Sequence, residues 1–188
     1  MKFVPTDLPG VVLVEPEIFS DPRGYFFEVY HQRKFKEVGI DDSFVQDNQS
    51  RSVKGTLRGL HAQRRKPQGK LVRALAGAIL DVAVDIRPDS PHCGSWVGIE
   101  LSEQRHNSLW IPPGFAHGFL VLSDEAVVEY KCTDLYDRED EIGVIWNDPR
   151  IAIDWPLESP PILSAKDEAW PSLDQLHAEL EGAEEQSR

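Results

Sequence analysis

Apolar and polar residues alternate along most of the chain in short runs, which glycine, proline, aspartate and asparagine interrupt. Between residues 79 and 86, Asp81 and Asp85 fall on one side of the alternation and aliphatic residues fall on the other. Because successive side chains of a strand point to opposite faces, this spacing predicts a strand with one aliphatic face. Similar runs predict strands at residues 11–14, 24–30, 71–76, 78–86, 96–101, 108–111, 118–122 and 126–133.

Turn sequences such as Pro112-Pro113-Gly114 separate these runs. Many short strands separated by turns are typical of a sandwich, jelly roll or barrel. Helical spacing is confined to the edges, at residues 31–38 and, after the capping residue Ser172, at residues 172–180. No repeat or linker interrupts the pattern. We therefore expect one all-β domain over residues 1–188, with a core barrel to about residue 170 and an acidic C-terminal helix and tail at 171–188.

Composition narrows the classes of function. The chain has 188 residues, with 32 acidic and 20 basic side chains and a net charge of −12, which disfavours a nucleic-acid partner. Its two cysteines form no metal-binding or disulfide pattern. The first five residues lack the apolar run of a signal peptide, and no segment is apolar enough to span a membrane, so we expect a cytoplasmic protein.

Polar side chains gather in four short stretches that a plain barrel would not need, at residues 21–28, 46–48, 57–70 and 112–119. His61 lies in the third stretch, between a glycine-containing turn and basic residues. A histidine exchanges protons near neutral pH, although a lone histidine is more often a hydrogen-bonded surface residue. The neighbouring Arg58, Gln63 and Lys70 favour a shared polar pocket at one mouth of the barrel.

His117 completes a Pro-Gly-x-x-His pattern that is typical of metal-binding barrels of the cupin type. Those barrels use an earlier His-x-His pair, whereas the chain has His61-Ala62-Gln63, and an amide is a poor ligand for a transition metal. A substrate contact is therefore favoured for His117 over a packed structural role, and both are favoured over a metal site. We expect neither a metal nor a cofactor.

Two other residues have ordinary structural interpretations. Tyr130 shares a strand face with Val128, so it is either a core tyrosine or a proton donor to the pocket. Asp167 reads as a solvated loop carboxylate, and the acidic run at residues 139–141 as an exposed loop. Nucleophile-elbow, dinucleotide-binding and Walker motifs are missing from the sequence. Composition and spacing thus predict a barrel with a histidine-bearing pocket, without naming a reaction.

A set of motifs in order along the chain resembles the dTDP-4-dehydrorhamnose 3,5-epimerase family. They are Asp21-x-Arg23-Gly24, Phe27-Glu28, Phe44-Val45-Gln46-Asp47-Asn48, Leu57-Arg58-Gly59-Leu60-His61-x-Gln63, Gln68-Gly69-Lys70-Leu71-Val72-Arg73, Asp81-Val82-Ala83-Val84-Asp85-Ile86-Arg87, Trp110-Ile111-Pro112-x-Gly114-Phe115-Ala116-His117-Gly118-Phe119, Tyr130-Lys131, Trp146-Asn147-Asp148 and Leu163-Ser164-x-Lys166-Asp167. Each motif is weak alone, but together they are specific and cover residues from about 10 to 170. One departure is Leu135, where many members carry an aromatic residue.

The resemblance implies a cupin-type jelly-roll barrel with short peripheral helices, which acts on a dTDP-sugar as a homodimer with exchanged N-terminal strands. It implies that His61 is the general base, that Asp167 orients it, that Tyr130 is the general acid, and that Lys70 lies by the enolate. The residues whose family counterparts bind the substrate are Arg23, Glu28, Gln46, Asn48, Arg58, His117, Glu141 and Lys166.

The reaction that the resemblance implies inverts C3 and C5 of a 4-keto sugar nucleotide through an enolate, in dTDP-L-rhamnose biosynthesis. A base on one face of the ring and an acid on the other meet that requirement. Three alternatives stay open on the sequence. They are an epimerase of C3 or C5 alone, a metal-dependent barrel with His61 and His117 as ligands, and a barrel that binds sugar nucleotides without catalysis.

Overall fold

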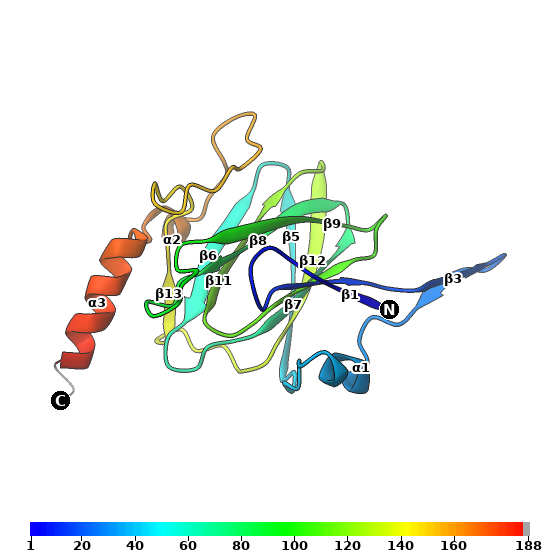
Figure 1. Cartoon of the computed structure of the whole chain (residues 1–188). Helices are drawn as coiled ribbons and strands as arrows, with labels where there is room; N and C mark the ends of the chain where they lie inside the picture. The colour runs from blue at the N-terminus through cyan, green and yellow to red at the C-terminus, as the bar shows by residue number, and fades with distance from the viewer. Residues whose placement is uncertain (186–188) are drawn as a thin grey trace.

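The computed structural model describes residues 1–185 of the chain, and two antiparallel sheets that face each other form most of it (Figure 1). One sheet has the strand order β1-β2-β10-β7-β12-β5 and the other β13-β6-β11-β8-β9. The bounds of their strands are β1 Lys2–Pro5, β2 Val12–Glu15, β5 Gln46–Val53, β6 Leu57–Gln63, β7 Lys70–Ala76, β8 Ala78–Asp85, β9 Trp96–Ser102, β10 Ser108–Ile111, β11 Phe115–Val121, β12 Glu125–Cys132 and β13 Glu141–Gly143. The prediction of an all-β jelly-roll barrel with short peripheral helices is confirmed.

Three hydrophobic clusters hold the layers together. The first fills the space between the sheets, with Val72 and Val128 from one sheet and Ile79 and Phe119 from the other. The second covers the outer face of the five-stranded sheet, where residues 144–176 pack on β6, β8 and β11. The third joins the six-stranded sheet to helix α1 (Gln32–Glu37) through the buried ring of Phe35. Both faces of each sheet are therefore partly buried.

The aspartates of β8 lie inside the barrel. Asp81 and Asp85 share a strand face, as the alternation predicts, and both are fully buried. Ala83 lies between them on that face, Ile79 precedes Asp81 on it, and both belong to the first cluster. The opposite face is aliphatic, but it is buried as well, under the C-terminal segment.

Helix α3 (Leu173–Glu185) continues beyond the predicted end at residue 180, and α2 (Ala165–Glu168) precedes it. Its buried residues Leu173 and Leu176 belong to the second cluster. Residues 186–188 of the predicted acidic tail lie outside the described residues. Within residues 1–185, no helix is both long and apolar enough to cross a bilayer.

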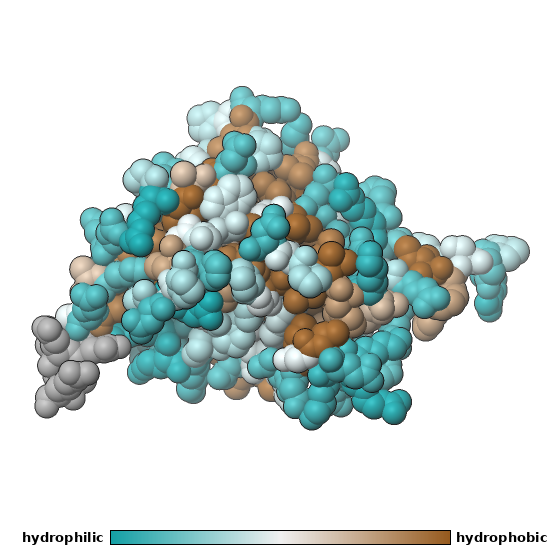
Figure 2. Space-filling model, in the orientation of Figure 1, coloured by the Kyte–Doolittle hydropathy of each residue, from teal (hydrophilic) through white to brown (hydrophobic). Residues whose placement is uncertain are grey.

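The strands β3 (Ile18–Asp21) and β4 (Gly24–Phe27) form a separate two-stranded hairpin that projects from the barrel (Figure 1). The predicted strand at 24–30 ends at Phe27, because Tyr30 turns to pack on Phe35 of α1. Large apolar and aromatic side chains lie exposed on this hairpin, where Figure 2 shows brown and tan atoms among teal ones. The exposed residues are Ile18, Phe19, Tyr25 and Phe26.

Candidate active site

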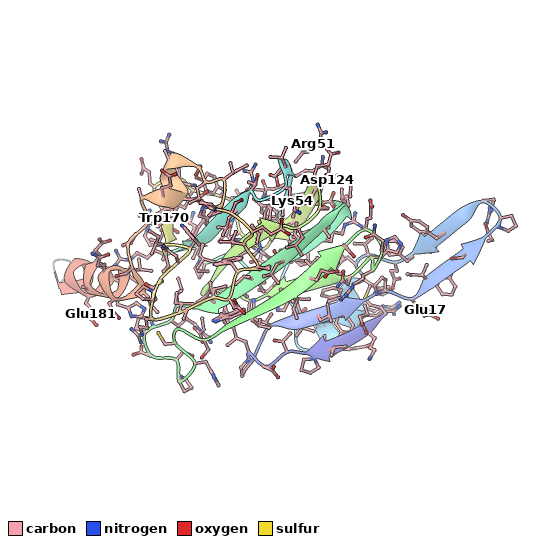
Figure 3. The ribbon with its side chains drawn as sticks, turned by 90° about the horizontal axis from the view of Figure 1, so that it is seen from above. Glu17, Arg51, Lys54, Asp124, Trp170 and Glu181 are labelled. Atoms are coloured by element: carbon pink, nitrogen blue, oxygen red, sulfur yellow. The ribbon has the colours of Figure 1, made fainter. Side chains whose placement is uncertain are left out.

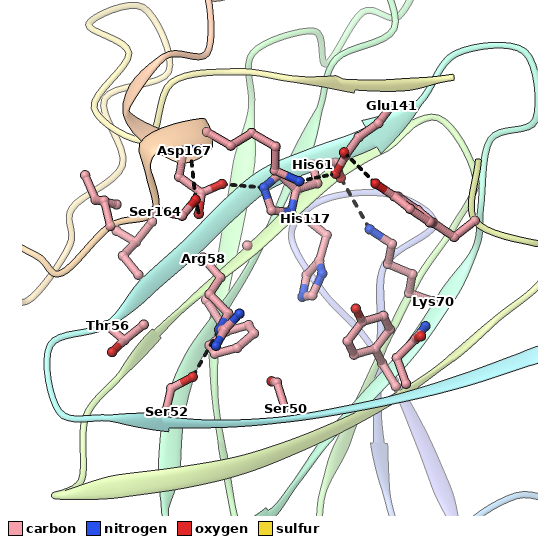
Figure 4. A pocket seen from close by; sticks show the side chains of 18 of the residues that line it. Ser50, Ser52, Thr56, Arg58, His61, Lys70, His117, Glu141, Ser164 and Asp167 are labelled. Carbon is pink, nitrogen blue, oxygen red and sulfur yellow. Dashed lines mark hydrogen bonds and ion pairs between the residues drawn. The ribbon is translucent and has the colours of Figure 1, made fainter. Parts of the chain in front are cut away.

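A cavity of about 1000 Å³ opens between the two sheets, and most of the predicted site residues line it (Figure 4). Its walls come from both sheets and from the segment that carries α2. Ten of the twelve predicted catalytic and substrate-binding residues line this cavity. They are Gln46, Asn48, Arg58, His61, Lys70, His117, Tyr130, Glu141, Lys166 and Asp167.

A bulge in β6 turns Arg58 and His61 toward the same cavity. Residues three apart on a regular strand face opposite ways. Here His61 pairs with His117 while Arg58 pairs with Phe119, so between these pairs two residues of β6 oppose the single residue Gly118 of β11. Gly59 lies in the bulge at a φ of +119°, and a Cβ there would stand 2.5 Å from the Cα of Gly118. The glycine that the sequence assigns to a turn is thus part of a strand.

His61 and Asp167 form a hydrogen-bonded pair in the cavity. The Nε2 atom of His61 lies 2.5 Å from Oδ1 of Asp167, and the Ser164 hydroxyl donates to Oδ2 at 2.8 Å. Asp167 is buried on α2, so its interpretation as a solvated loop carboxylate is wrong. Burial alone would raise the pKa of Asp167, but the hydrogen bonds from His61 and Ser164 outweigh it and hold that pKa below its usual value.

The charge on Asp167 decides the tautomer of His61. An ionised carboxylate only accepts hydrogen bonds, so Nε2 of the neutral imidazole carries the proton and donates it to Asp167. The lone pair is then on Nδ1, which makes the ring competent to accept a proton. The pair therefore has the arrangement of a general base with an orienting carboxylate.

Lys70 reaches across the cavity floor from β7. Its Nζ donates to the backbone oxygen of His61 at 3.3 Å, and the residue is 7% exposed. Burial lowers the pKa of the Lys70 ammonium, against the opposing influence of Cys132, Asp81 and Glu141. A buried cation beside the base is suited to stabilise negative charge that develops on a substrate oxygen.

Tyr130 faces the cavity from the opposite sheet to His61, since β12 and β6 belong to different sheets. Its ring packs partly on the first cluster and meets His117 edge-on, with ring centroids 6.2 Å apart. Burial raises the pKa of Tyr130, so the phenol keeps its proton at neutral pH. From the sequence, Tyr130 is either a core tyrosine or a proton donor to the pocket. Each interpretation holds in part, because the ring packs on the core and the protonated side chain faces the cavity.

His117 is a buried, neutral histidine. Its Nε2 lies 2.7 Å from Oδ1 of Asp81. Burial lowers the pKa of His117 although Asp81 favours the charged form, and Lys70 and His61 lower it further. Both cavity histidines thus bond a carboxylate through Nε2.

Gln63 stands where the metal-binding pattern has its second histidine, and its side chain forms hydrogen bonds with backbone groups. The amide nitrogen of Gln63 donates to the carbonyl oxygens of Lys66 and Leu135, and its oxygen accepts from the amide of Asp137. Within residues 1–185, no group of three histidine, cysteine or acidic side chains converges as a metal site would require. The donors around His61 and His117 do not fit a shared metal ion.

Glu141 and Lys166 form an ion pair at the edge of the cavity. Their side chains meet at 2.7 Å, and the Tyr136 hydroxyl donates to the second oxygen of Glu141 at 2.9 Å. The neighbouring Asp140 is buried and accepts from the backbone amides of Arg65 and Lys66. The prediction of an exposed acidic loop at 139–141 therefore holds for Glu139 and is wrong for Asp140 and Glu141.

Sequence reasoning missed Ser50 and Ser52, which continue the polar row of Gln46 and Asn48 along one face of β5. The hydroxyl of Ser52 accepts from Nε of Arg58 at 3.0 Å, and this bond orients the guanidinium (Figure 4). The Ser50 hydroxyl is buried without a partner among the described residues. A period of two counted from Gln46 would have found both serines.

Two predicted substrate-binding residues lie away from the cavity. Arg23 is at the tip of the β3–β4 hairpin, where its 90% exposed side chain pairs with Asp21 at 2.6 Å. Glu28 follows the hairpin and pairs with Lys34 at 2.6 Å. From above, the hairpin extends beyond the barrel at the end opposite Trp170 and the C-terminal helix (Figure 3). Within one chain these two residues are not part of the site.

Comparisons with known proteins agree on one family. The family model for dTDP-4-dehydrorhamnose 3,5-epimerase matches residues 5–175. The dTDP-4-dehydrorhamnose 3,5-epimerase of Methanothermobacter thermautotrophicus is 53% identical over 174 residues, which are 92% of this chain and 94% of the relative. That of Pseudomonas aeruginosa is 55% identical over 168 residues, 89% of this chain and 93% of the relative.

A solved structure shows the same likeness in three dimensions. The dTDP-6-deoxy-D-glucose-3,5-epimerase of Legionella pneumophila, in complex with dTDP-4-keto-L-rhamnose, superposes with a TM-score of 0.92 at 50% sequence identity. The match covers 95% of this chain and 96% of that one. Both the sequence and the fold are therefore shared over nearly the whole length.

Proposed function

The chain belongs to the dTDP-4-dehydrorhamnose 3,5-epimerase family, and from this premise we propose how it acts on its substrate. It inverts C3 and C5 of dTDP-4-dehydro-6-deoxy-D-glucose and yields dTDP-4-dehydro-L-rhamnose, in the synthesis of dTDP-L-rhamnose. The observation that carries the assignment of roles is the His61–Asp167 pair, which faces Tyr130 across one cavity.

The 4-keto group acidifies the neighbouring C–H bonds at C3 and C5. His61 removes a proton with Nδ1, and the electron pair of the broken C–H bond moves into an enolate whose oxygen carries the negative charge. Lys70 lies by that oxygen and stabilises it. Asp167 holds the imidazole and offsets the positive charge that the ring gains.

Inversion requires that the proton returns from the other face of the sugar. Tyr130 is on the opposite sheet to His61 and is protonated at neutral pH because of its burial. It donates its proton to the carbanion centre. Before the second inversion the phenolate takes up a proton from solvent, and the His61 imidazolium releases to solvent the proton that it had removed. One sheet of the barrel thus supplies the base, and the other supplies the acid on the opposite face of the sugar.

The remaining cavity residues bind the nucleotide. Arg58, which Ser52 orients, and Lys166 supply positive charge for the diphosphate, and Gln46 and Asn48 supply amides. His117 is neutral and contacts the sugar as a hydrogen-bonding group. This small set of converging cations is compatible with the overall charge of −12.

Arg23 and Glu28 enter the proposal through a second copy of the chain. The β3–β4 hairpin carries exposed aromatic residues and lies away from its own cavity, as a segment that docks on a partner would. In a homodimer with exchanged N-terminal strands, the hairpin brings Arg23 to the partner's cavity. We also expect residues 1–188 to act as one epimerase domain, with its core barrel at about residues 1–170, and the protein to work in the cytoplasm.

Proton NMR in D₂O tests the reaction directly. With dTDP-4-dehydro-6-deoxy-D-glucose, we expect the protons at both C3 and C5 to exchange with deuterium as the rhamno-configured product accumulates. Exchange at one carbon alone would identify a single-centre epimerase, and binding without exchange would identify a non-catalytic protein. Activity that a chelator abolishes and one divalent metal restores would favour the metal-dependent alternative.

A further inference from the structure

Trp170 follows α2 and packs against two residues of the site. Its indole meets the His61 imidazole edge-on, with ring centroids 5.9 Å apart and an angle of 63° between the planes. The Nζ of Lys166 lies 5.8 Å from the centre of the same ring. Trp170 is not among the residues that line the cavity, so it touches the base without being placed to touch the substrate.

Gly143 creates the space in which the indole lies. In the β13–β6 ladder Gly143 is the direct partner of His61. A Cβ on Gly143 would stand 2.5 Å from two ring atoms of Trp170, which is closer than any side chain allows. The next residue, Pro171, accepts a hydrogen bond from the amide of Ile145 at 2.8 Å, which fixes the backbone that follows Trp170.

The His61–Asp167 pair needs such a neighbour. Asp167 is held by Ser164, but a single hydrogen bond leaves the plane of the imidazole free to turn about it. The His61 side chain is also 26% exposed, and water that reaches the hydrogen bond would compete with it. A flat ring against the edge of the imidazole restricts both the rotation and the access of water.

We propose that Trp170 is a positioning residue, which keeps His61 in the Nε2-protonated tautomer bonded to Asp167 and so presents Nδ1 to the substrate. The inference rests on the proposed function of His61 as the base. Trp170 would thus affect catalysis from outside the cavity, and the space that its indole occupies explains the glycine at position 143.

The test compares Trp170→Leu and Trp170→Phe with Trp96→Leu. Leucine keeps an apolar side chain but removes the flat ring, whereas phenylalanine keeps the ring and removes an indole N–H that is buried without a partner in the described chain. Trp96 is a half-buried tryptophan on β9 that packs on the second cluster, so Trp96→Leu controls for loss of an indole elsewhere. Thermal melts verify that each variant folds.

The readout is ¹⁵N–¹H NMR of the histidine rings, with the His61 signals assigned by their loss in His61→Asn. We expect a single Nε2-protonated tautomer in the wild type, in Trp170→Phe and in Trp96→Leu, and a mixture of tautomers in Trp170→Leu. The kcat of Trp170→Leu falls about 10-fold because the base is misoriented. Trp170→Phe retains most of its kcat.

A folded Trp170→Leu variant with the wild-type tautomer and the wild-type kcat would overturn the inference. If Trp170→Leu fails to fold, Trp170→Ile and Trp170→Met are measured in the same way, and the wild-type tautomer in either of them overturns it too. The tautomer is read without substrate, so a proposed reaction that proves wrong remains distinguishable from a Trp170 that does not position His61.

Discussion

The central cavity and the β3–β4 hairpin both carry residues that the family motifs assign to the substrate, but they differ in what holds those residues. In the cavity, Asp167, Ser164 and the β6 bulge fix His61 within one chain. On the hairpin, the side chain of Arg23 pairs with Asp21, two residues before it, at 2.6 Å and is 90% exposed. The cavity lies between the sheets and has many polar side chains in its lining, whereas the hairpin projects from the barrel and exposes apolar side chains.

The difference indicates that the chain builds the proton-transfer chemistry by itself and leaves part of the binding to another copy. Hydrogen bonds in a buried site keep their strength, whereas an exposed ion pair is screened and contributes little. A residue such as Arg23 therefore gains a defined position only when a partner covers it. The following predictions test this division, from the largest expected effect to the smallest.

Loss of the base is expected to have the largest effect. His61→Asn and His61→Ala should lower both solvent exchange and product formation by about 10²–10⁴-fold, the range for loss of a general base. Proton NMR in D₂O measures both rates. His92→Asn is the matched control, because His92 is an exposed histidine outside the cavity. Near-wild-type exchange in a folded His61→Asn variant would contradict the proposed role.

Tyr130→Phe should separate deprotonation from inversion. The variant keeps the ring that packs on the first cluster, so the barrel stays folded. His61 and Lys70 still form the enolate, but the proton donor on the opposite face is missing. We expect product formation to fall by about 10²-fold while exchange at C3 or C5 falls less. Equal loss of both rates would instead point to a role for Tyr130 in holding the substrate.

Arg23→Ala should raise KM about 10-fold, in line with the loss of one hydrogen-bonded charge, and leave the chain folded because the side chain is exposed within its own chain. Lys2→Ala, another exposed cation of the N-terminal segment, is the control. An unchanged KM would remove Arg23 from the binding site.

Mixed dimers sharpen this prediction. If Arg23 acts in the partner's cavity, a dimer of one His61→Asn chain and one Arg23→Ala chain contains one complete site, which combines the His61 of one chain with the Arg23 of the other. Unfolding and refolding the two variants together should therefore restore activity at low substrate concentration. If the mixture is no more active than the separately refolded variants, Arg23 acts in the cavity of its own chain or does not bind the substrate.

The sequence predicts much of the barrel because its central strands alternate strongly. Residues 108–111 are predicted to the residue, and β7, β8, β9 and β12 to within two residues. The strands β5 and β6 escaped prediction because one face of each carries the polar side chains of the cavity, so that site residues break the hydrophobic pattern. The strands β1, β3 and β13 were not predicted either.

For a related reason, the sequence pattern predicts only some of the site residues. The polar stretch around His61 is visible, but no spacing rule brings Arg58 and His61 to one face, since that requires the bulge at Gly59. Asp167 is more than a hundred positions away, and its burial depends on the packing of α2 against β6. Motif resemblance supplied these residues, whereas local patterns did not.

The smallest expected effect concerns acid stability, where two carboxylates with lowered pKa values should behave differently. Burial opposes ionisation of Asp167, but hydrogen bonds from His61 and Ser164 lower its pKa below the unfolded value of about 3.9. Its contribution to stability is therefore fully present above about pH 4 and is lost as the pH falls through the folded pKa. The pKa of Asp21 is also lowered, by Arg23, but this pair is fully exposed.

Thermal melts from pH 7 to pH 2.5 should distinguish the two. Asp167→Asn should lower the free energy of unfolding at pH 7 on the order of 1 kcal/mol, and the gap to the wild type should close below about pH 4 as Asp167 itself is protonated. Asp21→Asn should follow the wild-type curve throughout, because salt screens an exposed pair. A gap for Asp167→Asn that stays constant at low pH would mean that packing, and not the ionised His61–Asp167 pair, holds the catalytic region together.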